Sequence, residues 1–184
     1  MLTILNAIEL FAYYLNKKGV ESPRSNAELL LAKIIRCKRM DLYLKFDQLL
    51  LHDKTNKYWD FIKRRGGEPL QYITGSVEFY GLEFIVNKNI LIHRQETELL
   101  VEEVISNFNS EESLKILDVG TGSWNISIFL VKHLPNSKIV SIDKSNKAIE
   151  VANINAENNN INGQIDFRTA DFNIADMEKF DVIV

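Results

Sequence analysis

Apolar residues recur at helical spacing through the first third of the chain. Ile4, Ile8, Phe11 and Leu15 follow one another at intervals of four, three and four residues, so a helix would gather them on one face. Gly19 is placed to end this helix, because glycine adopts the left-handed conformation at little cost. The pattern predicts an amphipathic helix with one face against a core.

Three more apolar stripes predict three further helices before Gly66-Gly67. Ser25 precedes Glu28 by three residues, which is the spacing of a capping box, and an apolar run follows. Asp41 is placed to cap the next helix. Four such stripes in succession are typical of a small helical bundle. The apolar residues of the last two stripes are Leu42, Phe46 and Leu49, then Tyr58, Phe61 and Ile62.

The pattern after Pro69 favours strands. Residues 76–87 carry aromatic and β-branched side chains on both sides of Tyr80-Gly81, which predicts two short strands joined by a tight turn. A helix is expected over residues 95–108. From Leu114 onward strands alternate with helices, which predicts an α/β fold with a parallel sheet and helices on its faces. The strands are expected in residues 114–120, 138–143, 164–168 and 180–184, and the helices from about Ser123 and about Asn146.

Composition adds little to this picture but excludes several classes of protein. The 184 residues are 46% hydrophobic and 26% charged, which is ordinary for a globular protein. A net charge of −3 argues against a general nucleic-acid binder, and the single cysteine, Cys37, excludes an internal disulfide. No apolar stretch reaches the roughly 18 residues of a membrane span. We therefore expect a cytoplasmic protein without direct contact to nucleic acid or membrane.

Three successive strand ends carry residues suited to a nucleoside. Gly120 and Gly122 would let the main chain approach a ligand where the next helix offers free N–H groups. Asp143 ends the second strand about 20 residues later, where it could accept hydrogen bonds from ribose hydroxyls. Asp171 and Phe172 follow the third strand, where a carboxylate and a ring could meet an adenine. Ligands of parallel α/β sheets bind at this edge, so the sequence predicts a nucleoside site.

Two residues favour S-adenosyl-L-methionine over a nicotinamide dinucleotide. The dinucleotide fingerprint has a small residue where this chain has Asn125. Asp118 precedes the first glycine, and its charge suits the cationic amino group of S-adenosyl-L-methionine better than a pyrophosphate. An NAD-dependent oxidoreductase remains the alternative from these residues alone.

The middle of the chain resembles a known family. The stretch GEPLQYITGSVEFYGLEFIVNKNILIHRQETELLVE, followed by ILDVGTGSWNISIFL, is similar to the release-factor glutamine methyltransferases, the HemK/PrmC family. The resemblance runs from about Ser22 to Val184. It implies a helical substrate-recognition domain over residues 1–67 and a β-hairpin linker over residues 68–92. Residues 93–184 would then be the first half of a Rossmann-like class I methyltransferase domain.

The resemblance also implies roles for individual residues. Peptide-chain release factors would be the partners, with the Gly-Gly-Gln glutamine amide as methyl acceptor. A loop of Arg94, Glu96, Thr97 and Glu98 would fold over the cofactor pocket. No metal is expected. The expected contacts to S-adenosyl-L-methionine are Asp118, Gly120, Thr121, Gly122, Ser123, Trp124, Asp143, Asp171 and Phe172.

The chain departs from the family pattern at three places. Relatives usually have Pro-Arg-Pro where this chain has His93-Arg94-Gln95, which predicts a looser loop and an incidental His93. Trp124 stands where the cofactor turn normally has glycine, which predicts weakened cofactor binding. The Asn-Pro-Pro-Tyr motif that would hold the glutamine is expected just after Val184, so no catalytic residue is assigned.

These departures leave two expectations for activity. The first is a family member, monomeric if complete, whose 184 residues alone do not transfer a methyl group. The alternative is an inactive, truncated remnant that acts at most as a release-factor-binding module.

Overall fold

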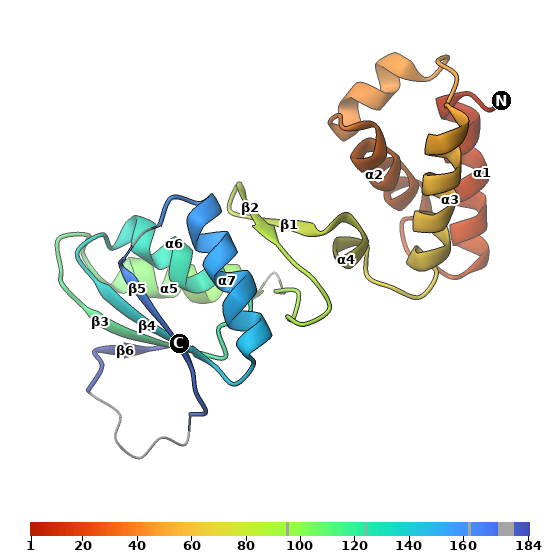
Figure 1. The fold of residues 1–184 in the computed structure, drawn as a ribbon. Helices are drawn as coiled ribbons and strands as arrows, with labels where there is room; N and C mark the ends of the chain where they lie inside the picture. Colours follow the sequence, from red (N-terminus) through yellow and green to blue (C-terminus); the bar gives the residue numbers. More distant parts are fainter. Residues whose placement is uncertain (95, 124, 162, 173–178) are drawn as a thin grey trace. The chain divides into compact units, whose positions relative to one another are not determined.

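The chain folds into two compact units, residues 1–74 and 75–184 (Figure 1). The computed structural model describes residues 1–94, 96–123, 125–161, 163–172 and 179–184. Residues 68–92, expected as a separate linker, are shared between the units. Residues 70–74 form the short helix α4 in the first unit, where Ile73 is buried in the helical core, and the hairpin belongs to the second unit.

The first unit is helical, as the apolar periodicity predicts. α1 buries the stripe of Ile4, Ile8, Phe11 and Leu15. Gly19 follows α1 with a positive φ of 72°, which confirms it as the residue after the helix end. The α-helices of this unit are α1 (Ile4–Lys17), α2 (Pro23–Ile35), α3 (His52–Arg65) and α4 (Leu70–Thr74).

The third predicted helix is a short 3₁₀ helix, η1, over Arg39–Lys45. Asp41 does accept a main-chain hydrogen bond near its start, from the N–H of Lys38 at 3.0 Å. Leu42 is buried, but Leu49 lies beyond η1 and forms a β-bridge with Thr3. The predicted stripe is wrong at Leu49, because an α-helical spacing does not survive the tighter 3₁₀ turn.

The predicted capping box between Ser25 and Glu28 is wrong. α2 begins at Pro23, whose fixed φ suits the first turn of a helix, so Ser25 lies inside the helix. Glu28 is fully buried and binds side chains of α2 and η1 instead of a helix end. Its carboxylate accepts hydrogen bonds from Arg24 at 3.1 Å, Arg39 at 2.7 Å and Tyr43 at 3.3 Å.

The second unit begins with the predicted hairpin. β1 (Ser76–Phe79) and β2 (Leu82–Ile85) pair in antiparallel fashion around the turn Tyr80-Gly81. Both turn residues have positive φ, 47° and 75°, which matches the twist of a two-residue hairpin. Phe79 and Phe84 turn inward and are completely buried in the core of this unit.

A parallel sheet with the strand order β5-β4-β3-β6 forms the rest of the second unit, which confirms the predicted α/β class. Figure 1 shows α5, α6 and α7 beside the sheet. Buried residues of these helices share one core cluster with Ile116, Ile139 and Ile165 of the sheet. Leu117, Val140 and Ile142 form a smaller cluster with Phe180. The elements are α5 (Glu96–Asn107), β3 (Lys115–Val119), α6 (Asn125–His133), β4 (Lys138–Asp143), α7 (Asn146–Asn158), β5 (Ile165–Thr169) and β6 (Val182–Ile183).

The strand order places the switch point of the sheet at β3. The chain runs outward from β3 to β4 and β5, then returns to pair β6 with the other side of β3. Open α/β sheets bind ligands beyond the carboxyl ends of the strands at such a point. Across the described ranges, no helix has the length and hydropathy that crossing a membrane requires.

Candidate functional site

The glycine turn after β3 lies at the switch point. Gly120 and Gly122 have positive φ, 74° and 54°, a conformation that other residues adopt only with strain. The N–H groups of Gly120 and Thr121 both donate to the carbonyl of Ile142, at 2.9 and 3.2 Å, which folds the turn across the end of β4. A Cβ added at Gly120 would meet no atom within 4 Å, so the main chain there faces open space.

Asp143 holds the glycine turn in place. Its Oδ2 accepts the N–H of Gly122 at 3.2 Å, and its Oδ1 accepts the N–H of Ser145 at 2.8 Å. A carboxylate can accept about four hydrogen bonds, so Asp143 keeps acceptor capacity for ligand hydroxyls. Its half-buried position at the end of β4 leaves that capacity accessible.

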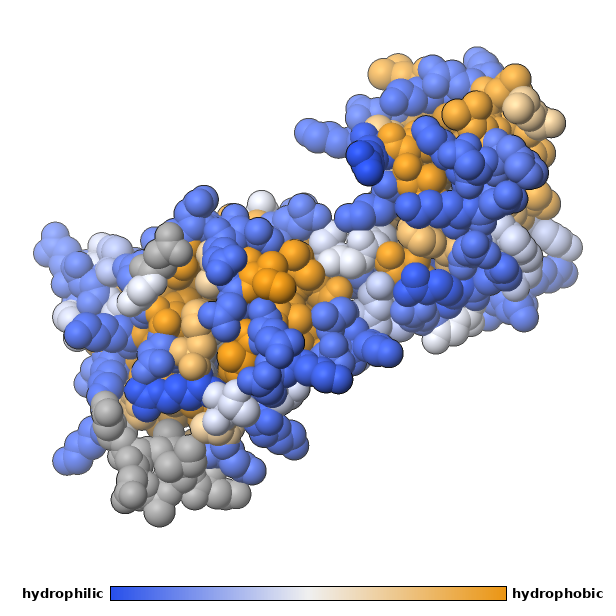
Figure 2. All heavy atoms as spheres, in the orientation of Figure 1, coloured by the Kyte–Doolittle hydropathy of each residue, from blue (hydrophilic) through white to orange (hydrophobic). Residues whose placement is uncertain are grey.

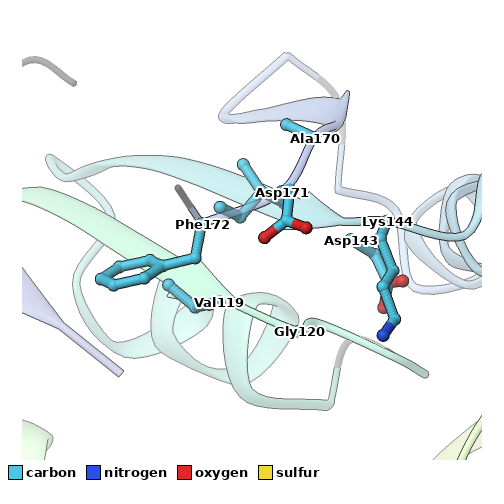
Figure 3. A pocket seen from close by; sticks show the side chains of 8 residues that line it. Val119, Gly120, Asp143, Lys144, Ala170, Asp171 and Phe172 are labelled. Carbon is cyan, nitrogen blue, oxygen red and sulfur yellow. The ribbon is translucent and has the colours of Figure 1, made fainter. Parts of the chain in front are cut away.

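The three predicted strand ends meet in one cavity of about 210 Å³. In Figure 3 the side chains of Asp143 and Asp171 lie around the same opening as Gly120, and the Phe172 ring lies beside Val119. Phe172 is 53% exposed, so the residue is accessible from solvent at the cavity. The lining residues are Val119, Gly120, Ile142, Asp143, Lys144, Ala170, Asp171 and Phe172.

Asp118 lies beneath the turn and is not among the residues that line this cavity. It is 1% exposed, and its Oδ2 accepts hydrogen bonds from Thr121 and, at 2.5 Å, from Ser127. Ser127 in turn contacts Ser141 of β4 at 2.7 Å. Burial raises the pKa of Asp118, although the hydrogen bonds from Ser127 and Thr121 act in the opposite direction. The carboxylate therefore braces the turn from below.

A second cavity, of about 140 Å³, adjoins the other side of the glycine turn. Of the residues expected in a covering loop, Glu96, Thr97 and Glu98 form the first turn of α5, so that part of the expectation is wrong. Thr97 lines the cavity, whereas Arg94 and Glu96 are exposed and are not lining residues. Leu91 and His93 complete that wall. The opposite wall is formed by Gly120, Thr121, Gly122, Ser123, Asn125 and Ile126.

His93 lies in a loop, as expected, and forms part of the wall of this cavity. Its Nδ1 is hydrogen-bonded to Nδ2 of Asn125, and its ring packs edge-to-face on Phe79 at 4.8 Å. Burial lowers the pKa of His93, while Glu98 and a main-chain hydrogen bond at Glu78 raise it. A neutral imidazole can accept the amide hydrogen of Asn125 at Nδ1, so the lowered pKa favours this contact.

Asn155 supports the glycine turn without lining either cavity, and it is not among the residues predicted from the sequence. It is completely buried in α7 and hydrogen-bonds both the hairpin, at Ile85, and the glycine turn, at Ser123. A signal was present, because Asn155 shares the buried face of α7 with Ala148 and Ala152. A polar residue on an apolar stripe is buried only at a cost unless it finds partners.

Two predicted positions lie outside the described residues. Trp124, expected in the cofactor turn, and Gln95, expected in the covering loop, therefore stay predictions. Within the ranges that the structure describes, no group of three or more His, Cys, Asp or Glu side chains is placed to hold a metal ion.

This arrangement defines an α/β protein of the class I methyltransferase fold: a parallel sheet with a glycine turn and an acidic residue at successive strand ends. Residues 110–184 match the family model of a methyltransferase domain, and residues 6–75 match the PrmC N-terminal domain. The chain belongs to the release factor glutamine methyltransferase family.

Curated relatives match almost the whole chain. It is 38% identical to the release factor glutamine methyltransferase of Koribacter versatilis, covering 100% of this chain and 66% of that protein. It is 34% identical to that of Rhodopirellula baltica, covering 98% of this chain and 64% of that protein. The chain thus spans slightly less than two thirds of the length of these relatives.

Among solved structures, ribosomal protein L11 methylase from Lactobacillus delbrueckii subsp. bulgaricus matches with 27% identity and a TM-score of 0.44. This match covers 53% of this chain and 49% of that one.

Proposed function

We propose that the chain binds S-adenosyl-L-methionine at the glycine turn and forms part of a methyltransferase that acts on the Gly-Gly-Gln glutamine of peptide-chain release factors. The observation that carries the proposal is the meeting of Gly120, Asp143 and Phe172, from three strand ends, around one cavity. The open space at Gly120 and the free acceptor capacity of Asp143 fit a nucleoside.

The residues around each cavity would bind a different part of the cofactor. Asp143 would bind the ribose hydroxyls, and Asp171 with Phe172 would meet the adenine. Gly120, Thr121, Gly122, Ser123 and Trp124 would follow the amino-acid part toward the second cavity, with Asp118 bracing the turn from below. When bound, the cofactor supplies a methyl group activated by a sulfonium.

Catalysis in such a protein depends on orientation, because a glutamine amide is a poor nucleophile. Positioning of reactants can lower a barrier by roughly 7–11 kcal/mol. The Asn-Pro-Pro-Tyr motif implied by the family resemblance does not occur in these 184 residues. We therefore propose that this chain alone binds the cofactor without transferring a methyl group.

The helical unit is proposed to recognise the release factor. A cavity of about 380 Å³ on this unit is lined by an outer stripe of α1 and by Trp59 of α3. The aromatic floor is ordered, since Trp59 stacks on Phe11 at 5.6 Å and meets Tyr14 edge-on at 4.8 Å. Figure 2 shows apolar surface on this unit among mostly hydrophilic residues. The lining residues are Leu10, Phe11, Tyr13, Tyr14, Lys17 and Trp59.

Three lysines lie over rings of this aromatic cavity, and one of them, Lys63, is paired with Asp60 at 2.8 Å. The ammonium groups of Lys17, Lys18 and Lys63 lie 5.3, 5.8 and 5.7 Å from the ring centres of Tyr13, Tyr14 and Trp59. An apolar floor with cations at its edge suits a protein segment that presents an apolar side chain beside carboxylates. We further propose a cytoplasmic protein, monomeric if complete, for which the single cysteine is suited, and no direct contact with nucleic acid, in keeping with the net charge of −3.

Calorimetry with S-adenosyl-L-methionine, together with a labelled-methyl transfer assay on a release factor, tests the proposal. We expect saturable cofactor binding and no transfer by the 184-residue chain. Absence of binding, with intact release-factor binding, would support the alternative of a release-factor-binding module. Methylation of the glutamine by this chain would show that catalytic residues lie within it.

A further inference from the structure

Asn155 uses one buried side chain to satisfy three main-chain groups. Its Oδ1 accepts the N–H of Ile85 at 2.7 Å, and its Nδ2 donates to the carbonyl of Ile85 at 3.0 Å and to the carbonyl of Ser123 at 3.2 Å. The residue is 0% exposed, so water cannot replace these partners without a change of structure. Only a carboxamide offers two donor hydrogens and an acceptor oxygen in this shape.

Asn155 makes the two main-chain hydrogen bonds at Ile85 that a neighbouring strand would otherwise make. Alternate residues of a hairpin strand direct their N–H and C=O groups away from the paired strand. Asn155 binds Ile85, and Asn159, one helical turn later, donates to the carbonyl of Glu83 at 3.4 Å. α7 thus covers the outer edge of β2, and Asn155 makes the shorter contacts.

The contact with Ser123 connects this strand edge to the glycine turn. Oγ of Ser123 donates to Oδ1 of Asn125 at 2.9 Å, and Asn125 is hydrogen-bonded to His93. Residues 86–94 are here called the covering segment. Hydrogen bonds hold this segment next to the glycine turn at both ends, at Ile85 just before it and at His93 within it. Asn155 makes the connection at Ile85, and Asn125 makes it at His93.

We propose that Asn155 is a positioning residue that sets the spacing between the glycine turn and the covering segment. The inference rests on the proposed function, because that spacing shapes the second cavity, where Leu91 and His93 face Ser123. Asn155 is not among the lining residues of either cavity, so it acts through the main chain that it holds. The nucleoside cavity shares Gly120 with the second cavity but is otherwise built from the ends of β3, β4 and β5, so we expect it to depend less on Asn155.

The test compares Asn155→Leu with Asn153→Leu in the full 184-residue chain, with S-adenosylhomocysteine and adenosine as ligands. Asn153 is an exposed residue of the same helix, so its substitution controls for helix propensity. We expect Asn155→Leu to weaken S-adenosylhomocysteine about tenfold or more, as unpaired buried groups imply, and to change adenosine affinity less than about twofold. Asn153→Leu should change neither. Affinities are measured well below the unfolding temperature of each variant.

Amide hydrogen exchange gives a second readout that needs no ligand. Asn155→Leu should speed exchange at Ile85 and in the covering segment, while exchange in the strands β3 and β4 stays slow. If this variant does not fold, Asn155→Ser, which leaves room for a water, takes its place. It is expected to show the same contrast between fast exchange in the covering segment and slow exchange in β3 and β4.

Three results would overturn the inference. They are unchanged S-adenosylhomocysteine affinity, equal loss of both ligands, or unchanged exchange in the covering segment. If the wild-type chain binds neither ligand, the proposed function fails, and the exchange result alone decides the role of Asn155.

Discussion

Oδ2 of Asp143 accepts the main-chain N–H of Gly122 at 3.2 Å, so the residue expected to bind a ribose also holds the glycine turn. The same carboxylate accepts the N–H of Ser145 just before α7. One side chain thus joins the ends of β3 and β4 at the point where a ligand would bind. This double role makes Asp143 the most informative single position in the nucleoside cavity.

Asp143→Ala is expected to weaken cofactor binding strongly. It removes a charged acceptor from the turn, from Ser145 and from the ribose position, and a hydrogen bond to a charged group contributes about 1.5–3 kcal/mol. We therefore expect an affinity loss of about tenfold to a hundredfold in calorimetry. Asp166→Ala is the control, because Asp166 is an exposed residue of β5 paired with Arg168. Equal affinity of Asp143→Ala and wild type would remove Asp143 from the site.

Asp118→Asn is expected to stabilise the fold at neutral pH. Burial raises the pKa of Asp118 in the folded chain, so the charged form is disfavoured there relative to the unfolded chain. The stabilising contribution of this group is therefore present at low pH and is lost as the pH rises through the raised pKa. Urea unfolding across pH should show an advantage of Asp118→Asn that grows with pH. If the difference in unfolding free energy between the variant and the wild type stayed constant or fell with pH, a raised pKa of Asp118 in the folded chain would be contradicted.

Ser25→Ala and Glu28→Ala should differ sharply in their effect on the helical unit. Ser25 lies inside α2 and caps nothing, so its substitution should change the free energy of unfolding by less than about 0.5 kcal/mol. Glu28→Ala leaves a buried hole and removes the acceptor of Arg24, Arg39 and Tyr43, which should cost about 1–3 kcal/mol. Thermal unfolding followed by circular dichroism measures both. Similar losses would restore the capping box.

Leu10→Ser combined with Tyr13→Ser should weaken release-factor binding. Both residues line the aromatic cavity and are 51% and 62% exposed, so their loss costs little folding stability. We expect a loss of about 1–2 kcal/mol in binding, measured by titration calorimetry, and weaker binding at higher salt. Leu44→Ser provides the control, since Leu44 is 86% exposed and is not a lining residue. An equal effect of the control would argue against the cavity as the binding surface.

Much of the fold and part of the site could be predicted from the sequence because their signals are local. The stripe from Ile4 to Leu15, the turn at Tyr80-Gly81 and the positive φ of Gly120 follow from preferences that act over a few residues. The prediction at Leu49 was wrong about the type of helix, and the prediction at Glu28 was wrong about its partners. The sequence around Glu28 predicts a capping residue, but its buried carboxylate accepts hydrogen bonds from Arg39 and Tyr43 of another element, η1.

The sequence by itself therefore determined the order of helices and strands, the α/β class, and the residues that stand at three strand ends. Only the tertiary structure decided which of them line a cavity. Asn155 and Ile85 are 70 residues apart, and their contact exists only because α7 packs on the edge of β2. Asp118 is buried, does not line the nucleoside cavity, and accepts hydrogen bonds from Thr121 and Ser127. Periodicity encodes which face of an element is apolar, whereas the pairing of distant polar groups depends on how the packed elements meet.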